Sequence, residues 1–285
     1  AVTYNGDGRQ DVYGVSGPVF RSTADSAIAI VLNRRDINAM GDGTYELESE
    51  NFGTSQRLCP GQRFFEQPST NGCSGTLVAR DLVLTAGHCA PAFPCSSANW
   101  VFGYYYQAEG ELQTITEDDV YACREIVALN EGSLDYALYR LDRPVQNRTP
   151  ARWLPMSMTT GEAVTLIGFP SGLPMKIDQG AVTRTTSTRL TAAIDAFGGN
   201  SGSGVFAPDG TLVGVLSAGN RDFVRQGRCR VVNNIVCGED CSDGEVVIRA
   251  DSVQASVCEA DDTLPWCANA VEPIGDEAVA PNSAA

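Results

Sequence analysis

The sequence predicts an all-β protein. Short apolar runs rich in Val, Ile, Leu and Tyr recur along the chain, and Gly, Pro, Asn and Asp separate them, as in strands joined by turns. Long segments with the 3.6-residue period of a helix are scarce. The 285 residues suffice for one large all-β unit or two fused smaller ones with a sizeable core. The runs occupy residues 27–32, 75–84, 134–141, 163–169, 205–206, 211–216 and 245–249.

Two changes of composition divide the chain. The stretch LDRPVQNRTPARWLP (141–155) holds three prolines between strand-like halves and is the best candidate for a linker. From Ser252 onward the sequence is acidic, contains Ala and Pro, and has little periodicity. We therefore predict a first half over residues 1–147, a second half over 148–251, and a C-terminal extension over 252–285 whose last fifteen or so residues form a mobile tail.

The charge excludes several partners. Lys and Arg number 20 against 35 Asp and Glu, which gives a net charge of −15 at pH 7. A surface this acidic disfavours nucleic acid and anionic membranes. No apolar run approaches the roughly 20 residues of a membrane-spanning helix. We predict no nucleic-acid partner and no membrane span.

Ten cysteines predict an oxidising compartment and five disulfides. Zinc is the competing use of cysteine, but only Cys237 and Cys241 approach ligand spacing, and a single histidine excludes most mixed Cys/His sites. The stretch YNGDGRQD, with Asp7 and Asp11, slightly resembles a calcium loop, although such a stretch is more often a turn. We predict no metal, no cofactor, and a secreted, periplasmic or cell-surface protein, with Ala1 as a processed or cloned mature start.

The stretch TAGHC (85–89) contains the only histidine of the chain, His88. An imidazole suits acid and base chemistry near neutral pH, because its ordinary pKa is about 6.5. A lone histidine is by itself more often a satisfied core or surface residue. Two further motifs favour the chemical interpretation.

The first motif, DAFGGNSGSGVF (195–206), places Ser201 among glycines ahead of a strand-like run. This suits a nucleophile on a tight turn whose backbone N–H groups stabilise an oxyanion. In the second, GSLDYALYRL, Asp135 stands at the start of an apolar strand, where a carboxylate is costly to bury unless a partner such as a histidine N–H meets it. Taken singly, these are an ordinary turn and an ordinary strand-capping acid. Together with His88 they supply a base, an orienting acid and a nucleophile.

The blocks CSGTLVARDLVLTAGHC, SLDYAL, GGNSGS and TLVGVLSAG resemble, in order, the signature blocks of chymotrypsin-fold serine proteases, and the similarity covers roughly residues 25–250. The start AVTYNGDGRQDVY and the Asn before the nucleophile resemble the secreted bacterial glutamyl-endopeptidase branch. The resemblance implies two six-stranded antiparallel β-barrels with the active site between them. His88 and Asp135 would come from the first barrel, within residues 1–147, and Ser201 and the specificity pocket from the second, within 148–251.

The resemblance also implies roles for other residues. Cys73 and Cys89 match a disulfide that brackets the histidine, which would anchor the turn holding the catalytic base. Gly199 and Ser201 match the two N–H donors of the oxyanion hole. Ser217 matches the serine that supports the triad acid. The edge formed by Ser217, Ala218 and Gly219 matches the strand that pairs with extended substrate backbone.

Two departures from the family pattern concern activation and specificity. Animal trypsins carry Asp directly before the nucleophile, where it binds a new N-terminal ammonium, but this chain has Asn200, whose uncharged amide would hold an ammonium far less strongly. In the bacterial branch the mature N-terminus instead helps to shape the specificity pocket, which could involve Ala1. Glutamyl endopeptidases carry a histidine on the strand after the nucleophile, and Leu216 occupies that position here.

Specificity is predicted from Asp195, six residues before the nucleophile, where trypsin-like enzymes keep the acid at the pocket base. Ala196 and Gly219 are small enough to leave a deep slot, and a carboxylate there would favour Arg or Lys. In the alternative, Asp195 points elsewhere and caps the loop. Arg221, just past the cleft edge, could instead offer a cation to an acidic side chain.

The sequence thus predicts a serine endopeptidase that forms an acyl-enzyme, acts on protein or peptide substrates, prefers Arg or Lys before the scissile bond, and is a monomer. Glutamyl or other specificity on the same scaffold is an alternative. A second alternative, a catalytically silent binding protein, is disfavoured because such proteins usually lose a triad member and none is lost here. A hydrolase of non-peptide esters is weaker still, since the cleft-edge strand implies a peptide.

Disulfide parity gives one further prediction. Five cysteines lie in the first half and five in the second. With Cys73 bonded to Cys89, three remain in the first half, so an odd number of bridges must join the halves if all ten are paired. Local pairing is entropically easiest. We therefore expect one cross-link between the halves, with Cys258–Cys267 as a local pair.

Overall fold

The apolar run at residues 27–32 forms strand β3 (Ile28–Asn33). Successive side chains of this strand enter two different buried clusters, which explains why the run is apolar throughout. Ala29 and Val31 of β3 join a buried cluster formed by first-half strands and the loops beside them. The even-numbered residues join a second cluster that extends into the second half of the chain. Both faces of the strand are therefore buried, which is the case in which a strand loses its polar alternation. The computed structural model describes residues 2–237 and 244–267.

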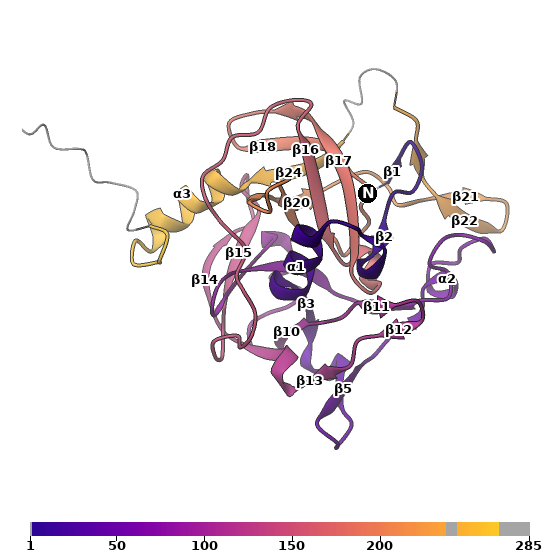
Figure 1. Ribbon diagram of the computed structural model, residues 1–285, viewed down its shortest axis with the longest axis horizontal. Coiled ribbons are helices and arrows are strands. Elements are labelled where there is room, and N and C mark those ends of the chain that lie inside the picture. The colour runs from indigo at the N-terminus through magenta and orange to yellow at the C-terminus, as the bar shows by residue number, and fades with distance from the viewer. Residues whose placement is uncertain (1, 238–243, 268–285) are drawn as a thin grey trace, which may run out of the picture.

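Six strands of the first half close into a barrel in the order β10-β14-β15-β9-β8-β3, and every neighbouring pair is antiparallel. The figures show this barrel in purple and magenta below the second one (Figure 1). Besides β3, its strands are β8 (Cys73–Ala79), β9 (Leu82–Thr85), β10 (Ala98–Phe102), β14 (Val120–Asn130) and β15 (Tyr136–Leu141).

A second ring follows the order β16-β19-β20-β24-β18-β17, and the pairing of β17 with β16 closes it. All of its neighbouring pairs are antiparallel as well. The predicted fold class of two six-stranded barrels is therefore confirmed. The strands are β16 (Ala163–Gly168), β17 (Lys176–Thr185), β18 (Arg189–Ala193), β19 (Gly204–Phe206), β20 (Leu212–Ala218) and β24 (Glu245–Arg249).

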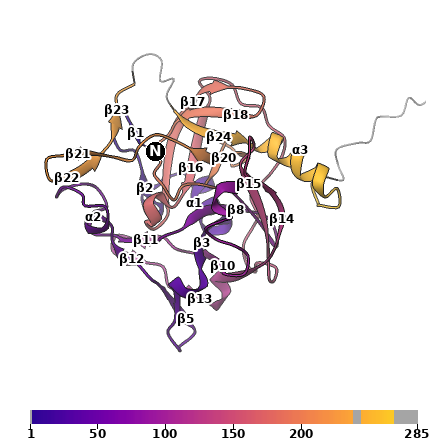
Figure 2. The ribbon, with the colours of Figure 1, turned by 180° about the vertical axis from the view of Figure 1, so that it is seen from behind.

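The start of the chain pairs with the second half. Strand β1 (Thr3–Tyr4) lies parallel to β23 (Asn234–Ile235). Figure 2 shows β1 beside the orange β23. Strand β2 (Gln10–Asp11) pairs antiparallel with β17 of the second barrel. A buried ion pair of 2.7 Å between Lys176 Nζ and Asp11 Oδ1 reinforces this pairing.

Two helices pack against the barrels. Helix α1 (Pro18–Ala27) begins with Pro at its first position, where the missing N–H is not needed, and buries Phe20, Ala24 and Ala27. Helix α3 (Ala250–Ala260) covers the start of the C-terminal extension, where we described little periodicity from Ser252 onward. That description is wrong for the residues of the helix. Its buried residues include Val253 and Val257 at helical spacing, and it packs on β20 and β24. The predicted mobile tail lies outside the described residues.

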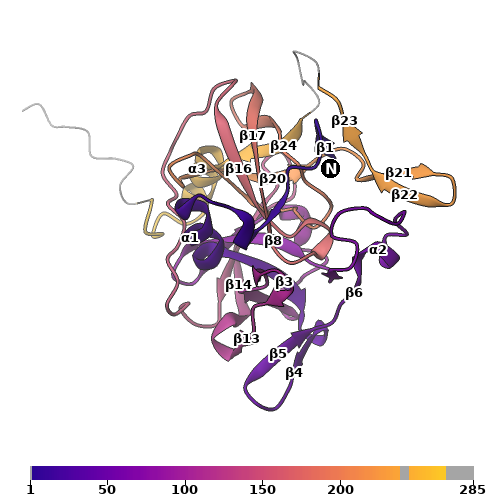
Figure 3. The same cartoon turned by 45° about the vertical axis from the view of Figure 1, so that its right-hand side comes forward.

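The remaining elements are short and lie outside the two barrels. A hairpin, β21 (Phe223–Gln226) with β22 (Cys229–Val232), projects beside the short helix α2 (Phe52–Ser55) (Figure 3). The other strands are β4 (Ile37–Ala39), β5 (Thr44–Leu47), β6 (Glu50–Asn51), β7 (Pro68–Ser69), β11 (Tyr106–Ala108), β12 (Glu111–Leu112) and β13 (Ile115–Thr116). No helix in residues 2–237 and 244–267 is long and apolar enough to cross a membrane.

Four disulfides are formed between described cysteines: Cys59–Cys229, Cys73–Cys89, Cys95–Cys123 and Cys258–Cys267. Only the first of these joins the two halves, as parity required, and the last is the expected local pair. None of the described cysteines is free. This degree of pairing indicates an oxidising compartment.

Candidate active site

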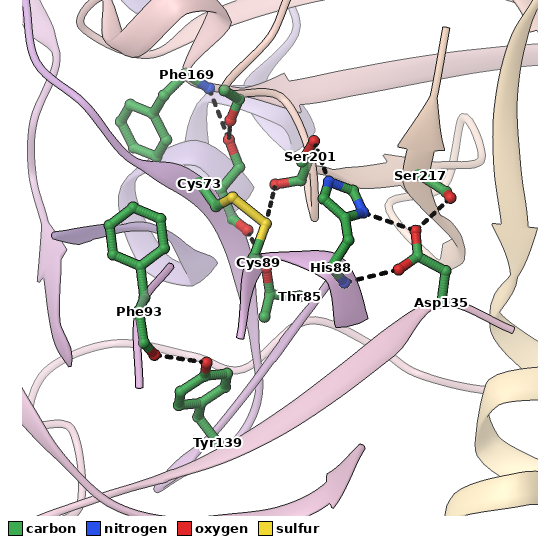
Figure 4. Close-up of a disulfide and its surroundings, with 12 residues drawn as sticks. Cys73, Thr85, His88, Cys89, Phe93, Asp135, Tyr139, Phe169, Ser201 and Ser217 are labelled. Carbon is green, nitrogen blue, oxygen red and sulfur yellow. Dashed lines mark hydrogen bonds and ion pairs between the residues drawn. A yellow bond between two sulfur atoms is a disulfide. The ribbon is translucent and has the colours of Figure 1, made fainter. Parts of the chain in front are cut away.

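His88 lies in a short 3-10 turn (Gly87–Cys89) that directly follows β9. The disulfide from Cys89 to Cys73 on β8 ties this turn to the neighbouring strand (Figure 4). The backbone N–H of His88 also donates to Asp135 Oδ1 at 2.8 Å. The turn is thus fixed at its backbone, which leaves the imidazole to be oriented by its two ring nitrogens.

The structure brings His88, Asp135 and Ser201 together in one chain of hydrogen bonds. His88 Nδ1 lies 2.9 Å from Asp135 Oδ2, and His88 Nε2 lies 2.8 Å from Ser201 Oγ. The hydroxyl of Ser217 donates to the same Asp135 Oδ2 (Figure 4). Because an ionised carboxylate can only accept, Nδ1 carries the proton and Nε2 is left to accept from the serine hydroxyl.

The electrostatics of the group favour an ionised acid. Burial of Asp135, which is 9% exposed, opposes ionisation, yet the hydrogen bonds from His88 and Ser217 hold its pKa below the usual value. The hydrogen bond with Asp135 in turn raises the pKa of His88 above its ordinary value of 6.5. Asp135 also adopts a φ of +34°, uncommon for a residue other than glycine. Such strained conformations concentrate at functional sites.

The nucleophile loop exposes two backbone donors beside Ser201. The N–H groups of Gly198, Asn200 and Gly202 all donate to protein acceptors. In contrast, the N–H groups of Gly199 and Ser201 have no acceptor in the part of the chain that the structure describes. The N–H groups of Gly199 and Ser201 are therefore available to bind an oxyanion, and these are the two donors that the resemblance assigned to the oxyanion hole.

The direction of the Gly199 N–H follows from the preceding peptide. The carbonyl of Gly198 accepts from Ser171 N–H at 2.5 Å. In a trans peptide the C=O and N–H point in opposite directions, so the Gly199 N–H points away from Ser171. Gly199 has φ of +90°, a conformation that other residues rarely adopt.

Ser74 attaches this loop to the first barrel. Its N–H donates to the Ser201 carbonyl at 2.9 Å and its hydroxyl donates to the Gly199 carbonyl at 2.8 Å. The hydroxyl also accepts from the N–H of Phe169 at 3.0 Å. Sequence reasoning missed this role, although Ser74 directly follows Cys73 in a quoted motif.

The predicted substrate edge is open. β19 pairs with β20 only between Gly204–Phe206 and Leu212–Val215. Beyond these positions no strand within residues 2–237 and 244–267 pairs with the same edge of β20, and Ala218 and Gly219 are exposed. The edge can therefore take an extended peptide by β-augmentation.

Asp195 does not lie at the base of an open pocket. It is 4% exposed, and its two carboxylate oxygens accept from the N–H groups of Tyr4 at 2.7 Å and Gly8 at 2.6 Å. Ala196 is fully buried in the core of the second barrel. The carboxylate of Asp195 thus caps the N-terminal segment, which is the alternative that the sequence left open.

Asp195 also lies beside a second acid. Its own N–H donates to Asp178 Oδ2 at 2.7 Å. Burial raises the pKa of both carboxyls, and the charge of Asp195 adds to the increase at Asp178. Two adjacent buried carboxyls of this kind resist ionising together. They serve the packing of the N-terminal segment.

Glu245, which the sequence did not single out, lies against the substrate edge. A Cβ placed on Gly219 would meet Glu245 Oε2 at 1.5 Å, so a glycine is needed there for the carboxylate to fit. Glu245 is fully buried and accepts from the Tyr4 hydroxyl at 3.1 Å, and burial raises its pKa to about 7. Glu245 lies 26 positions after Gly219, and the pairing of β24 with β20 brings the two residues together. The sequence alone gives no signal of this contact.

The acids of the YNGDGRQD stretch are already paired. Asp7 accepts from Arg9 Nε at 2.9 Å and from its terminal nitrogen at 2.7 Å, and Arg63 lies 3.2 Å away. Asp11 pairs with Lys176. The stretch therefore acts as an ion-paired turn between the N-terminus and the second barrel.

Comparisons with known proteins agree with this geometry. A family model described as the trypsin-like peptidase domain matches residues 73–215, about half of the chain. A search of curated proteins finds no matching sequence. The chain belongs to the trypsin-like peptidase family, and it is a serine protease by class.

Solved structures resemble it in fold. A Glu endopeptidase in complex with MPD is 18% identical, with a TM-score of 0.55, over 90% of this chain and 98% of that one. An inactive form of Rv3671c from M. tuberculosis H37Rv is 14% identical, with a TM-score of 0.52, over 88% and 94%. A serine endoprotease from Yersinia pestis is 13% identical, with a TM-score of 0.50, over 85% and 65%.

Proposed function

We propose that the protein is a secreted endopeptidase in which Ser201 is the nucleophile, His88 the general base and Asp135 the orienting acid. The observation that carries this proposal is the continuous hydrogen-bond chain from Asp135 through His88 to Ser201 Oγ. The four disulfides support secretion into an oxidising environment.

The geometry supports an acyl-transfer mechanism. Ser201 Oγ attacks the substrate carbonyl while His88 Nε2 takes its proton, and Asp135 stabilises the imidazolium that forms. The N–H groups of Gly199 and Ser201 stabilise the oxyanion, a contribution worth about 10²–10³ in rate for one such donor. The imidazolium then protonates the leaving amine, and water hydrolyses the acyl-enzyme by the reverse sequence of proton transfers.

Covalent labelling tests this proposal. A fluorophosphonate forms a bond to the activated serine oxygen, so the wild-type protein should be labelled stoichiometrically and Ser201→Ala should not be labelled. Ser203→Ala is the matched control, because that hydroxyl is buried and bonded to Asn200 Oδ1 instead. Absence of labelling in a folded wild-type protein would favour a catalytically silent binding protein.

The predicted preference for Arg or Lys loses its support at Asp195, and we do not include it in the proposal. A salt bridge to a basic substrate residue needs a carboxylate that the substrate can reach. The Asp195 oxygens are instead taken by Tyr4 and Gly8. Mass-spectrometric mapping of cuts in a peptide library measures the preference directly.

Asp195→Asn should leave the relative kcat/KM values for Arg, Leu and Glu peptides unchanged within about twofold, because the side chain faces the N-terminal segment. The amide can accept only one of the two N–H groups that the carboxylate holds. We expect the free energy of unfolding to fall by about 1–2 kcal/mol, as for a lost buried hydrogen bond. Denaturant unfolding and library cleavage measure the two effects. A selective loss on Arg and Lys peptides would restore Asp195 to the specificity pocket.

A further inference from the structure

A groove of about 670 Å³ lies between the loop after α2 and the β21–β22 hairpin. Five arginines and one aspartate line it, a net charge of +4 in a protein whose total charge is −15. We call it the arginine groove, and its charged residues are Arg57, Arg221, Arg225, Arg228, Arg230 and Asp222.

These arginines differ from most others in the chain. Eight of the arginines elsewhere form ion pairs with Asp or Glu. None of the five in the arginine groove forms an ion pair with a residue in 2–237 or 244–267, and all five are exposed. Five positive charges gathered with one negative charge repel one another, and a bound anion relieves that repulsion.

The walls of the groove are fixed in place. The Cys59–Cys229 disulfide joins the loop after α2 to the hairpin. The Arg230 N–H donates to the Arg57 carbonyl at 2.9 Å, and the Cys59 N–H donates to the Arg230 carbonyl at 2.8 Å. Figure 3 shows the hairpin beside α2. The backbone that carries the arginines is therefore held in place before a ligand binds, and such preorganisation strengthens binding.

The groove is continuous with the candidate active site. Gln56 and Asp222 also line an adjoining groove of about 620 Å³, which reaches Gly198 and Gly199 of the nucleophile loop. Asp222 Oδ2 accepts from the Gly198 N–H at 3.0 Å. A peptide held at Ser201 can therefore extend along one continuous surface into the arginine groove.

The chemistry of the lining selects carboxylates. A guanidinium binds a carboxylate through two parallel hydrogen bonds, which an ammonium cannot do. At 0.15 M ionic strength charges are screened over about 8 Å, so the local arginines outweigh the distant acids of the surface. A highly charged polyanion would extend beyond the groove and meet the acidic surface, because the net charge of the protein is −15. It is therefore a less favourable ligand than an acidic peptide segment.

We propose that the arginine groove binds an acidic segment of the protein substrate, outside the residues that flank the scissile bond. This inference rests on the proposed endopeptidase function. It assigns the groove a role in selecting substrates by a stretch of Asp and Glu, independently of the residue that precedes the cut.

The test uses peptides that share one cut sequence, found by library mapping, and that carry four Glu or four Gln on either flank. We expect the Glu peptide to have a KM about tenfold lower than the Gln peptide on one flank, with equal kcat. The variant Arg228→Gln with Arg230→Gln should remove this difference, since two exposed charged contacts together account for about tenfold. Both side chains are exposed, so the fold should persist in this variant.

The matched control is Arg124→Gln with Arg184→Gln, which removes the same charge from exposed positions on β14 and β17. Anisotropy of a labelled Glu peptide on the Ser201→Ala protein reports binding without cleavage, so failure of the groove is distinguishable from failure of catalysis. Equal KM values for Glu and Gln peptides, an equal loss in the control, or displacement of the peptide by a tighter-binding sulfated polysaccharide would overturn the proposal.

Discussion

Ser201→Ala and His88→Ala should each lower kcat on a peptide substrate by at least about 10⁴-fold, and the double variant should be no slower than either single one. The nucleophile and the base act on the same proton, so removing one leaves the other without a function. Because His88 is the only histidine of the chain, no neighbouring imidazole can replace it. Steady-state kinetics with an independently titrated wild-type reference measures the loss.

The control for this pair is Thr85→Ser, which keeps the hydroxyl that donates to the Ser74 carbonyl at 2.7 Å and leaves the reacting groups untouched. It should retain most activity. Near-full activity in His88→Ala would contradict the serine-protease mechanism. Additive losses in the double variant would mean that the two residues act separately.

Asp135→Asn should lower kcat by about 10⁴-fold, because an amide that donates to Nδ1 forces the proton onto Nε2, where it faces the serine. The pH dependence should change as well. In the wild type, kcat/KM rises with pH as His88 loses its proton, with a pKa above 6.5 because the bond to Asp135 favours the charged ring. Loss of the carboxylate lowers that pKa, so the limb moves to lower pH.

Kinetics across pH 4–9 and NMR titration of the single imidazole measure the two effects together. Ser217→Ala is the control, since it removes one donor to Asp135 but leaves the charge in place. It should lower kcat far less than Asp135→Asn. An unchanged pKa of His88 in Asp135→Asn would contradict the role of the acid.

The sequence predicts what depends on local pattern. Continuous apolar runs bounded by turn residues identify β3, β15 and β20, because both faces of these strands are largely buried. Strand β14 was not among the predicted runs, since its middle residues are exposed and charged. Helix α3 was missed because only one narrow face is buried.

The parts of the site that lie in short sequence motifs could be predicted, and the parts that depend on distant residues could not. The motifs around His88, Asp135 and Ser201 are each recognisable, and folding brings them within hydrogen-bond distance. The environment of Asp195 was not predictable, because it depends on Tyr4 and Gly8, which lie 191 and 187 positions away. The arginine groove depends likewise on the distant Cys59–Cys229 bridge.

The pairing of β2 with β17 sets the order in which the molecule can assemble. Asp11 pairs with Lys176, which lies 165 positions later. The length-dependent part of the entropy cost of closing such a loop is about 4.5 kcal/mol. All six strands of the first barrel lie within residues up to Leu141, so they can pair with one another without the second half of the chain. Long-range pairing of this kind slows folding. The separation of β2 and β17 along the chain therefore predicts that the N-terminal segment docks onto the second barrel late in folding.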